Sequence, residues 1–84
     1  MDALDGNAIA GMLVAAFGAE MTTATGVCAS CGAKSMLAEL AVYLRAPGAV
    51  ARCRSCGSVA MVLVEIRGTT LADTHGLAAL EPPA

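Results

Sequence analysis

Two short cysteine repeats constrain the fold of this chain more than any other feature of its sequence. Residues 28–32 read Cys-Ala-Ser-Cys-Gly and residues 53–57 read Cys-Arg-Ser-Cys-Gly, with twenty-one residues between Cys31 and Cys53. A single domain of 84 residues buries only about 60% of the surface that its unfolded chain exposes, so its hydrophobic core alone gives marginal stability. Domains of this size are commonly held together by disulfides or by a metal ion. Only the four cysteines can supply either.

The spacing within each repeat favours a metal ion. Two cysteines separated by two residues project their sulfurs into the same space when the chain turns tightly between them, and two such turns complete a tetrahedron around zinc. The glycines that follow, Gly32 and Gly57, can take a positive φ without a Cβ clash, so the chain can leave each turn. We therefore predict one tetrahedral ion, zinc, bound by four thiolates. The predicted metal ligands are Cys28, Cys31, Cys53 and Cys56.

The compartment matters, because four cysteines in an exported protein can equally form two disulfides. The N-terminal residues 1–6 carry two aspartates where a signal peptide needs positive charge, and Gly11 interrupts the apolar stretch that follows. No run reaches the roughly 18 to 20 apolar residues that span a bilayer. These features predict a cytoplasmic protein with reduced thiols and no membrane partner.

Charge and composition bear on the class of partner. The formal net charge is −2, with five Lys plus Arg and only two aromatic residues, Phe17 and Tyr43. Nucleic-acid binding usually needs a basic face and stacking aromatics, so it becomes the less favoured alternative. We interpret Arg45, Arg52 and Arg54 as balancing the anionic metal site rather than contacting phosphate. The apolar fraction of 57% favours a protein partner or self-association.

The first twenty residues are predicted to form an N-terminal helix. Asp2 or Asp5 can cap its start, and Gly18 can end it. Five apolar residues recur at the spacing that puts side chains on one helical face, a face that packs on the domain or contacts a partner. These residues are Ile9, Met12, Leu13, Ala16 and Phe17.

Between the cysteine repeats the sequence predicts a hairpin. Apolar segments at 40–45 and 49–53 flank Pro47-Gly48, a pair that suits the central positions of a type II turn. That turn closes between residues 46 and 49, which sets Leu44 opposite Ala51 and Val42 opposite Cys53. Residues 32–39 must bend, because a straight strand there would carry Cys31 away from Cys53.

Three further segments complete the predicted sheet. Residues 21–27 suit a short edge strand that leads into the first cysteine pair. Residues 59–67 are apolar through Ile66, as in a central strand covered on both faces. Residues 69–73 add a last strand, Gly76 interrupts the chain, and residues 82–83 mark a loose tail. The predicted fold is small α+β, with a helix and a three- to four-stranded antiparallel sheet.

No residue is predicted to be catalytic. His75 is the single histidine, and four thiolates leave the ion no vacancy for it, so we expect a surface or capping role. The serines near the two cysteine turns suit turn hydrogen bonds. These are Ser30, Ser35, Ser55 and Ser58.

Residues 27–67, with two Cys-x-x-Cys-Gly turns around a hairpin, resemble the zinc-ribbon superfamily. That resemblance implies a three-stranded antiparallel sheet with an ion between two cysteine turns. The segments 1–11 and 43–48 look more narrowly like a family of short, uncharacterised actinobacterial proteins, which has no established activity.

Rubredoxins share both cysteine turns and hold iron in the same tetrahedron, so a rubredoxin-like electron carrier is the first alternative. Rubredoxins pack several aromatics around the metal, whereas this chain has two aromatic residues and no Trp. The favoured interpretation is a non-catalytic zinc-ribbon protein that acts as a protein-binding or accessory module. A nucleic-acid-associated ribbon is the second alternative.

Overall fold

The computed structural model describes residues 3–83 and combines short helical segments with two antiparallel sheets. The helical segments are the 3-10 turns η1 (Gly6–Ile9) and η2 (Leu37–Glu39) and the helix α1 (Ala10–Phe17). The strands of residues 3–83 are β1 (Thr25–Cys28), β2 (Lys34–Met36), β3 (Ala41–Arg45), β4 (Gly48–Arg52), β5 (Val59–Ile66), β6 (Thr69–Asp73) and β7 (Leu77–Glu81). The predicted α+β class is confirmed.

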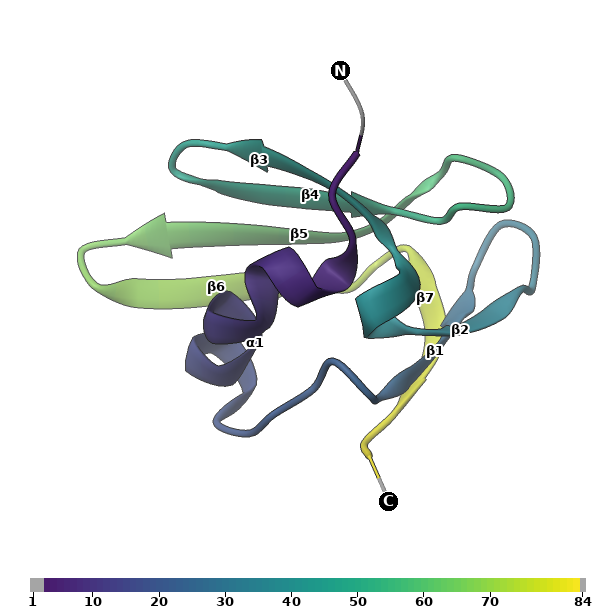
Figure 1. Ribbon diagram of the computed structural model, residues 1–84, viewed down its shortest axis with the longest axis horizontal. Helices are drawn as coiled ribbons and strands as arrows, with labels where there is room; N and C mark the ends of the chain where they lie inside the picture. Colours follow the sequence, from purple (N-terminus) through teal and green to yellow (C-terminus); the bar gives the residue numbers. More distant parts are fainter. Residues whose placement is uncertain (1–2, 84) are drawn as a thin grey trace.

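The structure has two sheets, whereas the sequence predicted one sheet of three to four strands. Strands β3, β4, β5 and β6 form a four-stranded sheet in that order, and a separate three-stranded sheet has the order β2-β1-β7. Figure 1 shows α1 beneath the four-stranded sheet and the three-stranded sheet to the right of α1. The β1–β2 and β4–β5 loops project together at the right edge. Each of these hairpins carries one cysteine pair, so two hairpins from different sheets present the four cysteines.

The N-terminal helix begins as a 3-10 turn and ends where the sequence predicts. The Asp5 side chain accepts a hydrogen bond of 3.0 Å from the backbone N–H of Asn7, whereas the alternative cap, Asp2, lies outside the described residues. Gly18 adopts a φ of 75° and donates its backbone N–H to the Val14 carbonyl at 2.8 Å. This left-handed residue closes the helix without a Cβ clash.

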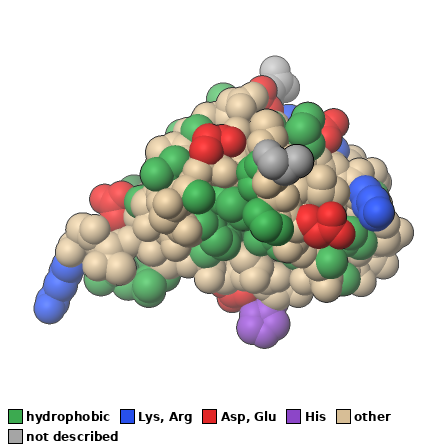
Figure 2. Space-filling view, turned by 90° about the horizontal axis from the view of Figure 1, so that it is seen from below, with side chains coloured by type: hydrophobic (Ala, Val, Ile, Leu, Met, Phe, Trp, Pro, Cys, Tyr) green, Lys and Arg blue, Asp and Glu red, His purple; other side chains and the backbone are tan. Residues whose placement is uncertain are grey.

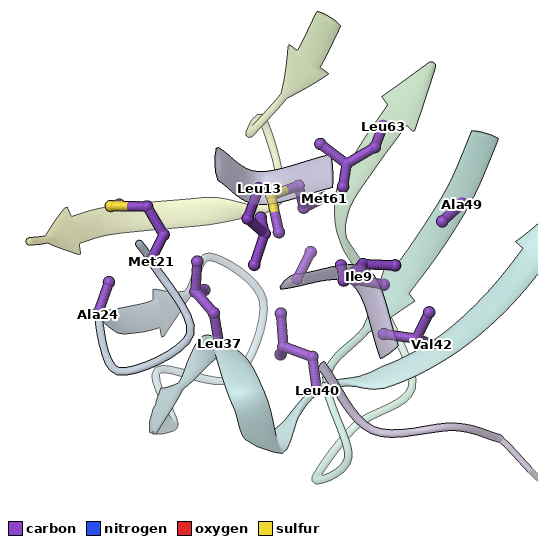
Figure 3. Close-up of a cluster of buried hydrophobic side chains, with 12 residues drawn as sticks. Ile9, Leu13, Met21, Ala24, Leu37, Leu40, Val42, Ala49, Met61 and Leu63 are labelled. Atoms are coloured by element: carbon purple, nitrogen blue, oxygen red, sulfur yellow. The ribbon is translucent and has the colours of Figure 1, made fainter. Parts of the chain in front are cut away.

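The hydrophobic core lies between the helical segments and both sheets (Figure 3). Ile9 and Leu13 are 1% and 0% exposed, so the face predicted from helical spacing packs against the core. Met12, Ala16 and Phe17 are partly buried against the same cluster. The helix therefore stabilises the domain through one apolar stripe, as helices this short must.

The β3–β4 hairpin forms, but its predicted register is wrong by two residues. Leu44 pairs with Ala49 rather than Ala51, and Val42 pairs with Ala51 rather than Cys53. Ala46 and Pro47 make the loop, joined by a cis peptide bond, so Pro47 occupies the third position of the turn rather than the second. Gly48 belongs to β4 instead, where a Cβ would collide with the Leu63 carbonyl of β5. Gly48 is therefore needed inside β4, where β5 approaches its backbone closely, and not in the turn.

Strand β1 was predicted at a sheet edge and lies at a sheet centre instead. It pairs with β2 on one side and with β7 on the other. No strand was predicted after residues 69–73, so β7, which covers this edge, was missed. Gly26 lets β7 approach, because a Cβ there would lie 3.1 Å from the Leu77 side chain.

Strand β5 is central in the four-stranded sheet, as predicted, but only one of its faces is fully covered. Met61 and Leu63 are each 1% exposed and face the core. Val62 and Val64 on the other face are half-buried, and Ile66 is 50% exposed. Within residues 3–83 no helix has the length and apolar character needed to cross a membrane.

Candidate metal centre

Each cysteine pair sits in a turn with the same backbone hydrogen bonds. In the first turn, residues 28–33, the Cys28 N–H donates to the Ala33 carbonyl at 2.9 Å, and the Gly32 N–H donates to the Cys28 carbonyl at 2.9 Å. The second turn, residues 53–58, repeats both bonds from Cys53 and Gly57, at 2.9 Å to the Ser58 carbonyl and 2.8 Å to the Cys53 carbonyl. We call these segments knuckle 1 and knuckle 2.

The two glycines close the knuckles as predicted. Gly32 has a φ of 76° and Gly57 a φ of 78°, and both lie in the left-handed region that favours glycine. The Cys-x-x-Cys-Gly pattern therefore specifies the turn locally. This explains why this part of the structure was predictable without knowledge of the rest of the chain.

The four sulfur atoms meet between the knuckles and lie within 4.8 Å of one another. Cys28 Sγ lies 3.7 Å from Cys56 Sγ, and Cys31 Sγ lies 3.7 Å from Cys53 Sγ. A tetrahedron with metal–sulfur bonds of about 2.3 Å has edges of about 3.8 Å, which matches both distances. No two of these cysteines form a disulfide. All four predicted ligands are thus brought together in an arrangement that could hold one metal ion.

Backbone N–H groups point toward the thiols, as the knuckle geometry requires. Hydrogen bonds from the backbone N–H groups of Cys56 and Ser55 lower the pKa of the Cys53 thiol. The Ser58 side chain and backbone N–H lower the pKa of Cys56 to about 6. The Ser58 hydroxyl oxygen is 3.2 Å from Cys56 Sγ, so the predicted turn role of this serine is confirmed.

Cys31 behaves in the opposite way. The Ala33 N–H lowers the pKa of its thiol, but desolvation and the three neighbouring sulfurs outweigh this and raise the pKa to about 12. The cause is that four thiolates so close together repel one another when no cation is present. A divalent cation among them supplies the positive charge that allows all four to ionise, which suits this donor set to metal binding.

Two arginines next to knuckle 2 donate hydrogen bonds to backbone carbonyls in and around it. Arg52 donates to the Gly57 carbonyl at 2.8 Å. Arg54 donates to the Glu39 carbonyl at 2.8 Å and to the Leu4 carbonyl at 3.3 Å. Arg54 therefore ties the knuckle to η2 and to the N-terminal segment, while Arg52 hydrogen-bonds within the knuckle itself.

The turn between β6 and β7 also holds the centre together, a role that was not predicted. The Gly76 carbonyl accepts a hydrogen bond of 2.9 Å from the backbone N–H of Ala29 in knuckle 1. The Gly76 Cα lies against the backbone of Val59 and Ala60, just after knuckle 2. This glycine therefore touches both arms that present the cysteines. The sequence showed only a lone glycine that interrupts the chain after residues 69–73, which does not predict this contact.

His75 has the surface position that the sequence predicts. Its side chain is 98% exposed, and its Nδ1 lies 2.9 Å from the Asp73 carboxylate. The same carboxylate accepts the His75 backbone N–H at 2.9 Å, and this hydrogen bond lowers the pKa of Asp73. The pair caps the β6–β7 turn and contributes no atom to the sulfur cluster.

The fold and the cysteine centre together define a small α+β protein with a four-cysteine site able to hold a metal ion. Over its whole length, residues 1–84, the chain matches a family of unknown function, DUF6510, and it belongs to that family. Comparison with curated proteins and with solved structures gave no match.

Proposed function

We propose that this protein is a non-catalytic zinc-binding module of the ribbon type, with a structural ion held by the two knuckles. The observation that carries the proposal is the convergence of four sulfurs at distances that fit one tetrahedral ion. Four protein ligands fill every position of a tetrahedral site, so no position is left for an activated water. The zinc-ribbon resemblance agrees with this proposal and remains a prediction.

The proposed role is that of a protein-binding or accessory module in a reducing, cytoplasmic compartment, where thiols stay available for metal. The acidic net charge and the scarcity of aromatics disfavour nucleic acid as the partner. Part of the apolar surplus reaches the surface. Figure 2 shows hydrophobic side chains gathered in the middle of one face, with acidic side chains around them. Such a surface suits contact with protein rather than with polyanions.

The metal identity is tested on protein purified from cells without added metal. We expect a colourless protein with about one zinc per chain, because zinc in four thiolates has no visible absorption and no redox chemistry. Metal analysis and a visible spectrum of the same sample measure both properties.

The iron alternative predicts the opposite metal content and visible spectrum. Ferric iron in four thiolates gives a coloured, reducible protein. One iron per chain with reversible loss of colour on reduction would replace the zinc proposal with the rubredoxin-like electron carrier. A zinc-substituted sample of the same protein is the matched reference for the spectrum.

A further inference from the structure

The outer face of the four-stranded sheet carries a set of exposed and half-buried apolar residues. Because paired residues of antiparallel strands project to the same side, the register defines this face. Val50 pairs with Val62, and Gly48 pairs with Val64. The same rows continue to Tyr43 on β3 and to Leu71 on β6. Tyr43 and Leu71 are 37% and 54% exposed, whereas Ala49 and Leu63 on the α1 side are 3% and 1% exposed.

Charge is distributed unevenly across this face. Tyr43, Arg45, Val50 and Arg52 line a shallow hollow of about 250 Å³ on the β3–β4 side. Within residues 3–83 neither arginine forms an ion pair with an acidic side chain. The opposite edge carries Asp73, which stands in the same cross-strand row as Tyr43. The face is therefore basic at one edge, apolar in the middle and acidic at the other edge.

We propose that this face binds a second copy of the same chain, which makes the protein a face-to-face dimer. A two-fold axis parallel to the strands, between β4 and β5, lays β3 of one copy over β6 of the other. Asp73 of one copy then meets the hollow between Arg45 and Arg52 of its partner. An interface of this kind is self-complementary, so each contact occurs twice.

The apolar rows fit the same arrangement. The axis places β4 over β5, so Val50 meets Val62 of the second copy, and Gly48 meets Val64. A glycine opposite a valine leaves room for the branched side chain, as interdigitating sheet faces require. The arrangement thus pairs apolar with apolar, small with large and basic with acidic.

The size of the face sets the strength of the dimer. Four strands about 4.8 Å apart, each contributing about five residues at about 3.4 Å, give a footprint of roughly 300 Å². Standard interfaces cover about 800 Å² on each partner. We therefore expect a dimer that forms and dissociates with concentration rather than a permanent one.

Sedimentation equilibrium from about 1 μM to 1 mM tests the proposal on the metal-loaded protein. The native chain should pass from monomer to dimer across this range. Val62→Glu should remain monomeric, because it buries a charge in the apolar row. Arg45→Glu should weaken the dimer about tenfold or more, because it sets like charges together.

Lys34→Glu is the matched control, since it makes the same charge change on β2 of the other sheet and should leave the dimer unchanged. A native chain that stays monomeric at 1 mM, or a dimer that tolerates Val62→Glu and Arg45→Glu, would overturn the proposal. So would binding of another protein or a nucleic acid to this face of a monomeric chain. The inference concerns the partner of the module proposed above. Metal content is measured on the same samples. A monomeric chain that holds one zinc ion would contradict the dimer alone, whereas a chain without zinc would contradict the zinc proposal.

Discussion

Removal of the proposed zinc ion should unfold the protein. Structural zinc contributes about 10–16 kcal/mol to the folding of small zinc domains at neutral pH, and a whole domain is stable by only about 5–15 kcal/mol. The two knuckles come from different sheets, so the ion would join the two sheets at this end of the fold. Circular dichroism and proton spectra, recorded under reducing conditions before and after chelation, measure the effect.

A pair of variants separates loss of the ion from nonspecific effects of chelation. Cys53→Ser removes one ligand and should give an unfolded or severely destabilised chain. Ser55→Ala changes an exposed side chain in the same knuckle and should fold like the parent. Native spectra after verified metal removal, or a Cys53→Ser variant as stable as the parent, would be incompatible with a structural ion.

Gly76→Ala should destabilise the metal-loaded protein by about 1–3 kcal/mol or more, the usual range for overpacking a filled site. The added Cβ would collide with the backbone of Val59 and Ala60. Backbone atoms cannot rotate away, so the β6–β7 turn must move and loosen its hydrogen bond to Ala29 in knuckle 1. Urea unfolding at a fixed zinc concentration measures the change in the free energy of unfolding.

Gly11→Ala is the control for that substitution. Nothing lies within 4 Å of a Cβ at this helical position, and alanine is favoured over glycine in a helix by about 0.5–1 kcal/mol. The control should therefore be more stable than the parent. If Gly76→Ala unfolds at the same urea concentration as the parent, the β6–β7 turn does not hold the knuckles together.

The parts of the fold that were predictable are those that short segments specify by themselves. The cysteine spacing and the glycines at positions 32 and 57 determine the knuckles locally. The apolar stripe through Ile9 and Leu13 likewise predicts the helix and the face that it buries. Asp5 and Gly18 mark its ends through capping and positive φ.

The errors arise where distant segments decide the outcome. Strand β7 is rich in alanine and becomes a strand by pairing with β1, about fifty residues earlier in the chain. That pairing also turns β1 from an edge strand into a central one. Gly48 fits a turn when its neighbours alone are considered, yet β5 requires it inside β4. The contact between Gly76 and both knuckles also joins segments that are distant in the chain, so the residues next to Gly76 could not predict it.

X-ray absorption spectroscopy at the edge of the bound metal tests the central claim most directly, because it counts the ligands of the ion and measures their distances. The sample is the full chain purified under reducing conditions without added metal. Four sulfur ligands at about 2.3 Å around one zinc ion are the predicted result. A chain without metal, or an ion whose shell contains nitrogen or oxygen in place of one or more sulfurs, would contradict a closed site built from Cys28, Cys31, Cys53 and Cys56.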